Sequence, residues 1–333
     1  MQDVLPLAQQ RTSGTAVRER RAVRLEHRHA QHAEREQRTD ERADEQSAHR
    51  SRGLVEPLAE LVEGAAVETI SRDGDQWCVE AGGHRYHSRA VVVADGSSSS
   101  LAGPLGLGPE RPRYAAAVAV DVDAAVLEPS TARFEFGLVR HGFCWAFPRQ
   151  GGYSIGVGTF VGREAADADA VLAQLLPSLG LPPDAGLRVR SPLRVWDGHH
   201  ALHVPGAVVV GDAASLCDPF LAEGLRPALL SGVRAAEAVD RSLAALHQGG
   251  AGDQAAAADA LSEYSAAMRR DWGESMAWGR RIAQVFYRVP KVGYQLGIKR
   301  PTAPQRIAQI LSGEMGYGDI AQRVIKRLLF QRG

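Results

Sequence analysis

The stretch VVVGDAASLCDPFLAEGLRPALLSGVRAAEAV, from Val208 to Val239, contains the strongest structural signal in this chain. Its first three residues are a β-branched run, which is typical of a short parallel strand covered on both faces. Apolar residues then recur with helical spacing, at Leu225, Leu229, Gly232, Ala236, Val239 and Leu243. The stretch therefore predicts a buried strand, a sharp turn, a loop and a long helix.

The turn of this unit carries its candidate chemistry. Gly211 lets the backbone bend and approach a ligand closely. Asp212 offers a carboxylate to a hydroxyl group just past the carboxyl end of the strand. The following helix points its positive end back at this turn, which suits an anion such as a reduced flavin. An ordinary strand-turn-helix crossover without a cofactor is the alternative for the Gly-Asp pair alone.

The complete stretch resembles the second FAD fingerprint of the glutathione-reductase-like flavoproteins, and most closely that of the geranylgeranyl reductases. In that family the Asp of the Gly-Asp pair binds the ribose of FAD, which implies this role for Asp212, with Gly211 beside it. The family's P-x-x-G-E-G-I loop lies against the isoalloxazine ring. Its matching residues here are Pro219, Glu223, Gly224 and Leu225. Ala222 stands where the family has its first glycine.

Length and composition exclude several other classes. At 333 residues the chain allows two domains and a sizeable core. The formal net charge is zero, so no overall basic field points to a nucleic acid partner. The three cysteines are scattered without metal-ligand spacing, and we expect buried thiols in a reducing cytoplasm. We expect no membrane-spanning helix and no secretory signal, because the necessary apolar runs are absent.

Residues 1–53 differ in composition from the rest of the chain. They are dense in Arg, His, Glu and Gln, and large apolar residues are nearly absent after Leu25. Such a segment cannot bury enough surface to offset its ordering entropy, so we expect it to be disordered or to form a solvated helix. An out-of-frame or mis-started translation of a GC-rich gene is our hypothesis for its origin.

The resemblance begins only at Leu54. Flavoproteins of this type open with a strand, a G-x-G-x-x-G turn and a helix, which hold the pyrophosphate of the cofactor. The sequence has no such turn, and its glycine pair Gly156 and Gly158 lies in a strand-like segment that opens no helix. The resemblance therefore implies a FAD-binding domain without its amino-terminal phosphate-binding unit.

Residues 65–96 predict three short strands, separated by Asp-Gly and Gly-Gly turn signals. The third strand, Ala90 to Ala94, ends at Asp95 and Gly96. This exit resembles the A-D-G-x-x-S step that follows a small meander in FAD-dependent reductases and hydroxylases, which implies a cofactor-binding role for Asp95 and Gly96. A polar strand exit capped by Asp95 is the alternative.

Residues 114–199 predict a second domain with several strands. The segment FCWAFP, from Phe143 to Pro148, resembles the [YF]-x-W-x-F-P motif in the substrate-binding sheet of geranylgeranyl reductases. Alternation places Phe143, Trp145 and Phe147 on one face of a strand. Such an aromatic wall suits an apolar, polyunsaturated chain, and plain sheet core is the alternative.

Residues 249–333 predict helices. Gly313, Glu314 and Tyr317 resemble the family's G-E-x-x-Y element. The last predicted helix has an apolar face made of Ile320, Val324, Ile325, Leu328 and Leu329. We expect this face in the core, with peripheral contact to a membrane surface as the alternative.

The resemblance implies an α/β fold with three parts. These are an incomplete glutathione-reductase-type FAD-binding domain (54–113 and 200–248), an inserted antiparallel substrate-binding sheet (114–199) and a helical carboxy-terminal region (249–333). The implied function is FAD-dependent reduction of isoprenoid double bonds, with NAD(P)H or another donor regenerating the flavin. The alternatives are a flavin-dependent hydroxylase or halogenase on the same fold, and a non-catalytic remnant or a flavin-free chain that binds apolar molecules. The sequence names no acid-base residue.

Overall fold

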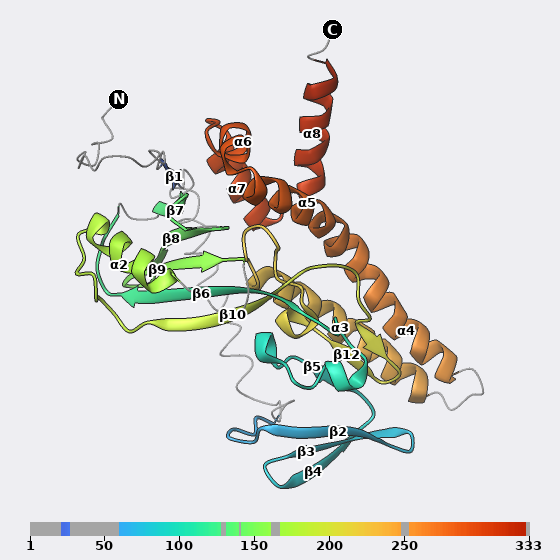
Figure 1. Ribbon diagram of the computed structural model, residues 1–333. Helices are drawn as coiled ribbons and strands as arrows, with labels where there is room; N and C mark the ends of the chain where they lie inside the picture. Colours follow the sequence, from blue (N-terminus) through green and yellow to red (C-terminus); the bar gives the residue numbers. More distant parts are fainter. Residues whose placement is uncertain are drawn as a thin grey trace, which may run out of the picture.

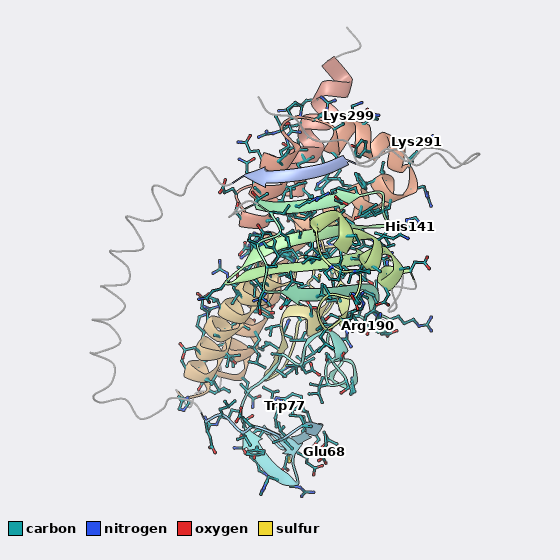
Figure 2. The ribbon with its side chains drawn as sticks, turned by 90° about the vertical axis from the view of Figure 1, so that its left-hand side faces the viewer. Glu68, Trp77, His141, Arg190, Lys291 and Lys299 are labelled. Atoms are coloured by element: carbon teal, nitrogen blue, oxygen red, sulfur yellow. The ribbon has the colours of Figure 1, made fainter. Side chains whose placement is uncertain are left out.

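Three β-sheets and a series of carboxy-terminal helices form the part of the chain that the computed structural model describes (Figure 1). The described residues are 21–26, 60–127, 131–139, 141–160, 167–247 and 253–330. Figure 2 shows the two ends of the arrangement, with Glu68 and Trp77 at one end and Lys291 and Lys299 at the other. Within the described residues, no helix has the length and apolar character needed to cross a membrane.

A three-stranded antiparallel meander lies at one end of the molecule. It consists of β2 (Val67–Asp73), β3 (Gln76–Ala81) and β4 (His84–Ser88). The expected Asp-Gly and Gly-Gly turns connect these strands. The sequence analysis was wrong about the strand count in 65–96, because the chain leaves the meander after Ser88 and forms a fourth strand, β5 (Val91–Val93), in another sheet.

The short parallel pair of β5 and β12 (Ala207–Val209) positions the candidate site. Val91 pairs with Ala207 and Val93 with Val209, so the carboxyl ends of the two strands lie side by side. β12 is completely buried, as its β-branched sequence predicts. A third strand, β11 (His203–Val204), pairs antiparallel with β12 on its other edge.

The largest sheet is antiparallel throughout, with the order β1-β7-β8-β9-β6-β10. Its strands are β1 (Arg21–Glu26), β6 (Arg113–Val122), β7 (Thr131–Phe136), β8 (Gly142–Arg149), β9 (Gly152–Thr159) and β10 (Val189–Val195). One face packs against α2 (Ala168–Leu175) and the 3₁₀ turn η3 (Leu176–Leu179). Aromatic side chains on the other face pack against the carboxy-terminal helices. The expected antiparallel sheet is therefore present.

Strand β1 departs from the disordered or helical state expected for residues 1–53. Arg21–Glu26 pairs antiparallel with all six residues of β7. A neighbouring strand with open backbone donors and acceptors can pair with such a segment through the backbone alone. The rest of this amino-terminal segment lies outside the described residues.

The last third of the chain is helical, as expected. Its elements are α3 (Leu225–His247), α4 (Asp253–Met268), the π-helical turn η5 (Arg269–Gly273), α5 (Glu274–Arg288), α6 (Pro290–Gly293), the π-helical turn η6 (Tyr294–Ile298), α7 (Ala303–Ser312) and α8 (Tyr317–Phe330). Helices α3 and α4 pack side by side (Figure 1). The apolar face proposed for α8 includes side chains outside the described set, so its role stays a prediction.

Helix α3 has the expected position, although the apolar residues whose spacing indicated the helix are not its fully buried ones. Its buried residues are the small or compact Pro227, Ser231, Ala235, Ala238 and Ser242. Leu225 and Leu229 are 72% and 63% exposed. The reason is close approach, because only short side chains let the helix lie directly against the Gly211 turn that precedes it.

Candidate functional site

The Gly211 turn connects β12 to the 3₁₀ helix η4 (Gly211–Ala214). Gly211 has φ +58°, in the left-handed region that glycine adopts without strain. Its N–H donates a 2.9 Å hydrogen bond to Ser231 Oγ, which fastens the turn to α3. A Cβ atom on Gly211 would lie 3.3 Å from Ala228 Cβ, so the turn and the helix are in close contact.

Asp212 follows at the carboxyl end of the strand and is half-buried. Within the described residues its carboxylate accepts no hydrogen bond. Burial raises the pKa of Asp212 to about 6, and Glu223 adds to the rise while Arg194 opposes it. A Cβ atom on Gly224 would lie 3.1 Å from Asp212 Oδ1, so the second loop glycine leaves room beside the carboxylate. The turn thus presents a shielded acceptor that suits the hydroxyl groups of a ligand.

Asp95 has the structural role that was the alternative interpretation. Its carboxylate accepts hydrogen bonds from the N–H groups of Ser100 (3.1 Å) and Leu101 (3.4 Å), and so closes the loop that follows β5. Gly96 opens a short 3₁₀ helix, η1 (Gly96–Ser98), with φ +74°. Binding of a cofactor by Asp95 and Gly96 therefore stays a prediction, and the visible use of the Asp95 carboxylate is internal.

Arg194 joins the exits of the two parallel strands, and the sequence analysis missed it. Its guanidinium donates hydrogen bonds to the carbonyl oxygen of Ser99 and, at 3.3 Å, to that of Ala213. Arg194 is 7% exposed on β10 and also lies over the ring of Tyr114. The available signal was a charged residue at an alternating strand position, where a buried residue is expected.

The loop from Pro219 to Gly224 is fixed by hydrogen bonds to the side chain of Asp218. Asp218 Oδ1 accepts hydrogen bonds from the N–H groups of Phe220 (2.6 Å) and Leu221 (2.9 Å). Asp218 Oδ2 accepts a third from the hydroxyl of Tyr317 (2.7 Å). Asp218 is almost completely buried, which raises its pKa above the usual value, while these hydrogen bonds oppose the rise. The loop conformation thus depends on one buried carboxyl group.

Ala222 shows why this loop favours glycine in the family that the sequence resembles. Its φ is +55°, in the left-handed region where a side chain is strained. Glu223, expected to bind the cofactor, accepts a 2.6 Å hydrogen bond from Arg226 N and so caps α3. Leu225, also expected at the cofactor, is mostly exposed, and Pro219 is buried within the loop.

The aromatic wall forms as alternation predicts. Phe143 and Trp145 have ring centroids 6.2 Å apart, and Trp145 and Phe147 are stacked at 6.1 Å, so the three rings share one face of β8. The indole of Trp145 lies over two glycines of β9, because a Cβ atom on Gly156 would come within 2.2 Å of it and one on Gly158 within 3.4 Å. The mid-chain glycine pair therefore makes space for a tryptophan.

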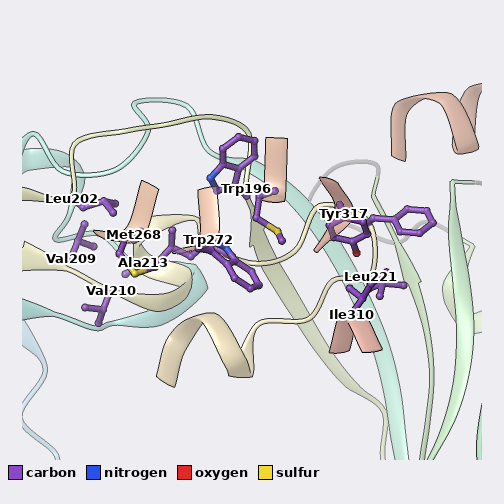
Figure 3. Close-up of a cluster of buried hydrophobic side chains, with 14 of the residues drawn as sticks. Trp196, Leu202, Val209, Val210, Ala213, Leu221, Met268, Trp272, Ile310 and Tyr317 are labelled. Carbon is purple, nitrogen blue, oxygen red and sulfur yellow. The ribbon is translucent and has the colours of Figure 1, made fainter. Parts of the chain in front are cut away.

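The wall is continuous with the loop through further rings. The ring centroid of Phe143 lies 6.4 Å from that of Phe160, and the Phe160 centroid lies 5.2 Å from that of Tyr287. The Tyr287 centroid in turn lies 5.9 Å from that of Phe220 in the loop. Figure 3 shows Leu221 and Tyr317 in the same buried region as this loop. A chain of aromatic contacts therefore connects the wall to the loop.

The described residues contain neither a disulfide nor a candidate metal site. Cys78, Cys144 and Cys217 are free and buried, as expected. No group of three or more His, Cys, Asp or Glu side chains in the described ranges could hold a metal ion.

Comparisons with known proteins support the fold. No protein family model matches the chain. An uncharacterized protein of Methanosarcina barkeri is 24% identical over 193 residues, covering 57% of this chain and 49% of that protein. The digeranylgeranylglycerophospholipid reductase of Methanocaldococcus jannaschii is 27% identical over 190 residues, covering 52% of this chain and 48% of the reductase. The match thus spans about half of each curated relative.

Solved structures give the same result for the architecture. A geranylgeranyl bacteriochlorophyll reductase-like protein of Thermoplasma acidophilum superposes with a TM-score of 0.56 at 17% identity, over 67% of this chain and 58% of that one. The Diels-Alderase PyrE3 of pyrroindomycin biosynthesis superposes with a TM-score of 0.50 at 19% identity, over 75% of this chain and 55% of that one. The chain has a mixed α/β fold with antiparallel sheets that is geranylgeranyl reductase-like.

Proposed function

We propose that this chain is a FAD-dependent oxidoreductase of the geranylgeranyl reductase type that reduces isoprenoid double bonds. The observation that carries the proposal is Asp212, a half-buried carboxylate with a raised pKa and no hydrogen-bond donor among the described residues. Supporting it are the geranylgeranyl reductase-like fold and the distant likeness to a digeranylgeranylglycerophospholipid reductase. The division into FAD-binding, substrate-sheet and helical regions is part of this proposal.

The residues around the Gly211 turn fit the flavin side of FAD. Asp212 would accept hydrogen bonds from the cofactor's sugar or ribityl hydroxyls, and Gly211 and Gly224 would leave room for it. Ser215, one turn further on, has a buried hydroxyl with no hydrogen-bond partner in the described region, which a polar ligand could satisfy. FAD, when bound and reduced, supplies the hydride for such a reduction.

The aromatic face would hold the substrate chain. Phe143, Trp145 and Phe147 present apolar rings that suit a polyunsaturated hydrocarbon. Trp145 and Phe147 are half-buried, whereas Phe143 is buried. NAD(P)H is the proposed donor that regenerates the flavin, and peripheral contact with a membrane is proposed for the delivery of so apolar a substrate.

The sequence has no G-x-G-x-x-G turn, and this allows a specific prediction about the relative affinities for FAD and FMN. That turn and its helix hold the pyrophosphate of FAD in this kind of fold. We therefore expect the chain to bind FAD weakly and only little better than FMN, because both ligands share the flavin side. Equilibrium dialysis followed by flavin absorbance measures both affinities.

A matched pair of variants assigns the site. Asp212→Asn removes the charged acceptor at the turn, and we expect it to lower the affinity for both FAD and FMN about tenfold. Asp240→Asn, on the exposed side of α3, changes the same charge away from the turn and should leave binding unchanged. Equal binding by the wild-type and Asp212→Asn proteins would contradict the proposal, and tight FAD binding with weak FMN binding would show a pyrophosphate site elsewhere in the chain.

A flavin-dependent hydroxylase or halogenase on the same fold is the second candidate. Quenching of tryptophan fluorescence by geranylgeraniol, compared between wild-type protein and Trp145→Phe, separates the two. Quenching that disappears in the variant supports the isoprenoid reductase, and identical quenching supports the second candidate.

A further inference from the structure

A cavity of about 270 Å³ opens behind the Asp212 turn, between residues 196–202 and the end of α4. Ala214 and Leu216 form its inner boundary, and the exposed side chains of Ser262 and Arg269 lie at its rim. Pockets for small molecules are typically about 300–1,000 Å³, so this one suits a small ligand or the polar end of a larger one.

The lining divides into an apolar floor and a polar rim. The floor includes the buried side chains of Trp196, Leu202 and Met268, which Figure 3 shows within the same hydrophobic cluster. The rim carries hydrogen-bonding side chains: His199, His200, Ser262, Ser265 and Arg269. A ligand with one charged end and one apolar part would match both surfaces.

Two of the rim side chains are already held in place. His200 Nε2 lies 2.7 Å from Asp197 Oδ1, and Ser265 Oγ lies 2.7 Å from His203 Nδ1. In contrast, neither the side chain of His199 nor that of Arg269 takes part in an ion pair or hydrogen bond within the described part of the chain. A guanidinium without a carboxylate partner beside an apolar cavity is suited to an incoming anion.

The backbone around these two groups is unusual. Arg269–Gly273 forms a π-helical turn between α4 and α5, and such turns often occur at functional sites. A Cβ atom on Gly273 would lie 2.5 Å from His199 Cε1, so the imidazole occupies the space that this glycine leaves. The His199 ring also meets the Trp196 ring edge-on at 5.3 Å. The π-helical turn thus brings Arg269 to the rim of the cavity and leaves space there for the His199 ring.

The local charges favour one anionic group. Burial is the main cause that lowers the pKa of His199, and the nearby Arg269 and His200 lower it further, while Glu274 opposes the shift. His199 is therefore neutral at pH 7 and can donate one N–H group, and Arg269 supplies the positive charge. Asp271, which lies on the same π-helical turn as Arg269, forms an ion pair with Arg234 instead.

We propose that this cavity binds a phosphomonoester-type oxyanion with an apolar substituent. Arg269 pairs with the oxyanion, His199 and the Ser262 hydroxyl donate hydrogen bonds to it, and the substituent rests on Trp196 and Met268. Asp212 is not among the residues that line the cavity, and the proposal does not depend on the flavin chemistry.

The test compares inorganic phosphate with n-butyl phosphate on the full chain at constant ionic strength. Binding is followed by NMR through the histidine Cε1–H signals. We expect n-butyl phosphate to bind about tenfold more tightly than phosphate, because its chain covers the apolar floor. Arg269→Gln should lower the affinity for n-butyl phosphate about tenfold or more. Saturation with the ligand should also raise the pKa of His199, since an anion favours the charged imidazole.

Arg270→Gln is the matched control, because Arg270 is the next residue, is also exposed, and is paired with Glu263 outside the cavity lining. It should leave the affinity unchanged. Both arginines are at the surface, so neither variant is expected to impair folding. Equal losses in the two variants would overturn the proposal by showing a diffuse charge effect. No binding, or equal affinity for the two phosphates, would overturn it as well.

Discussion

The hydroxyl of Tyr317, at the start of α8, donates a 2.7 Å hydrogen bond to Oδ2 of Asp218, 99 positions earlier in the chain. Both residues are buried, and the other carboxylate oxygen of Asp218 holds the backbone N–H groups of Phe220 and Leu221. A residue of the last helix therefore fixes the loop that we propose to lie against a flavin.

Tyr317→Phe tests this connection. The change leaves a buried oxygen of Asp218 without its donor, and we expect the free energy of unfolding to fall by about 1–3 kcal/mol. Urea denaturation measures the loss. Tyr86→Phe, which removes an exposed hydroxyl on the meander, is the control and should cost little. A Tyr317→Phe protein as stable as wild type would show that the hydrogen bond has no net effect.

Asp212→Asn is expected to change stability in a pH-dependent way. The pKa of Asp212 in the folded protein, about 6, is above its ordinary value of 3.8. A raised folded-state pKa gives stability that is complete below about pH 4 and is lost as the pH rises through about 6. Without a ligand, the Asn variant should therefore be more stable than wild type at pH 7.5, by about 1–3 kcal/mol. Chemical denaturation at pH 4 and pH 7.5 tests this, and an Asn variant that is less stable at pH 7.5 would contradict it.

Ala222→Gly is expected to stabilise the protein. Ala222 has φ +55°, and a left-handed alanine costs about 1–2 kcal/mol that glycine avoids, partly offset by the greater freedom of glycine in the unfolded chain. Ala236→Gly, at an exposed position inside α3, provides the opposite case and should destabilise by about 1 kcal/mol. Thermal unfolding of the two variants should shift in opposite directions. A shift to lower temperature in both would show that Ala222 is unstrained.

Gly156→Ala is expected to disturb the aromatic wall. The new Cβ atom would lie 2.2 Å from the indole of Trp145, and overpacking of this kind costs about 1–3 kcal/mol. Gly158→Ala introduces the same methyl group at 3.4 Å, so its effect should be clearly smaller. Tryptophan fluorescence and urea denaturation report on both. In a Trp145→Ala background the cost of Gly156→Ala should largely disappear, and an undiminished cost there would locate the strain elsewhere.

The sequence predicted the elements whose signal is local. The β-branched run before Gly211 is buried strand β12, the long helix follows it, and Phe143, Trp145 and Phe147 share a face. Each of these predictions uses a period of the backbone itself, either two or about 3.6 residues. Features within one element were therefore accessible without coordinates.

What the sequence did not predict came mainly from contacts between distant segments. Helical spacing located α3 but did not show which of its residues are buried against the Gly211 turn and the strands. The loop-closing hydrogen bonds of Asp95 could not be predicted from its position after a strand, and cofactor binding by Asp95 stays a prediction. No local spacing could pair Asp218 with Tyr317, although Tyr317 had been marked by its motif. The Arg269 cavity depends in the same way on two segments that are about 70 positions apart.

Arg194 has a mechanical consequence for the region around Asp212. One planar guanidinium, carried by β10, donates to carbonyl oxygens on both strand exits, at Ser99 and Ala213. Because the donors of a guanidinium have a fixed geometry, neither exit can shift alone without breaking a buried hydrogen bond. Arg194 therefore couples the two exits to the large sheet that carries β10, so that a ligand displacing one exit would act on the other exit and on β10 through the same side chain.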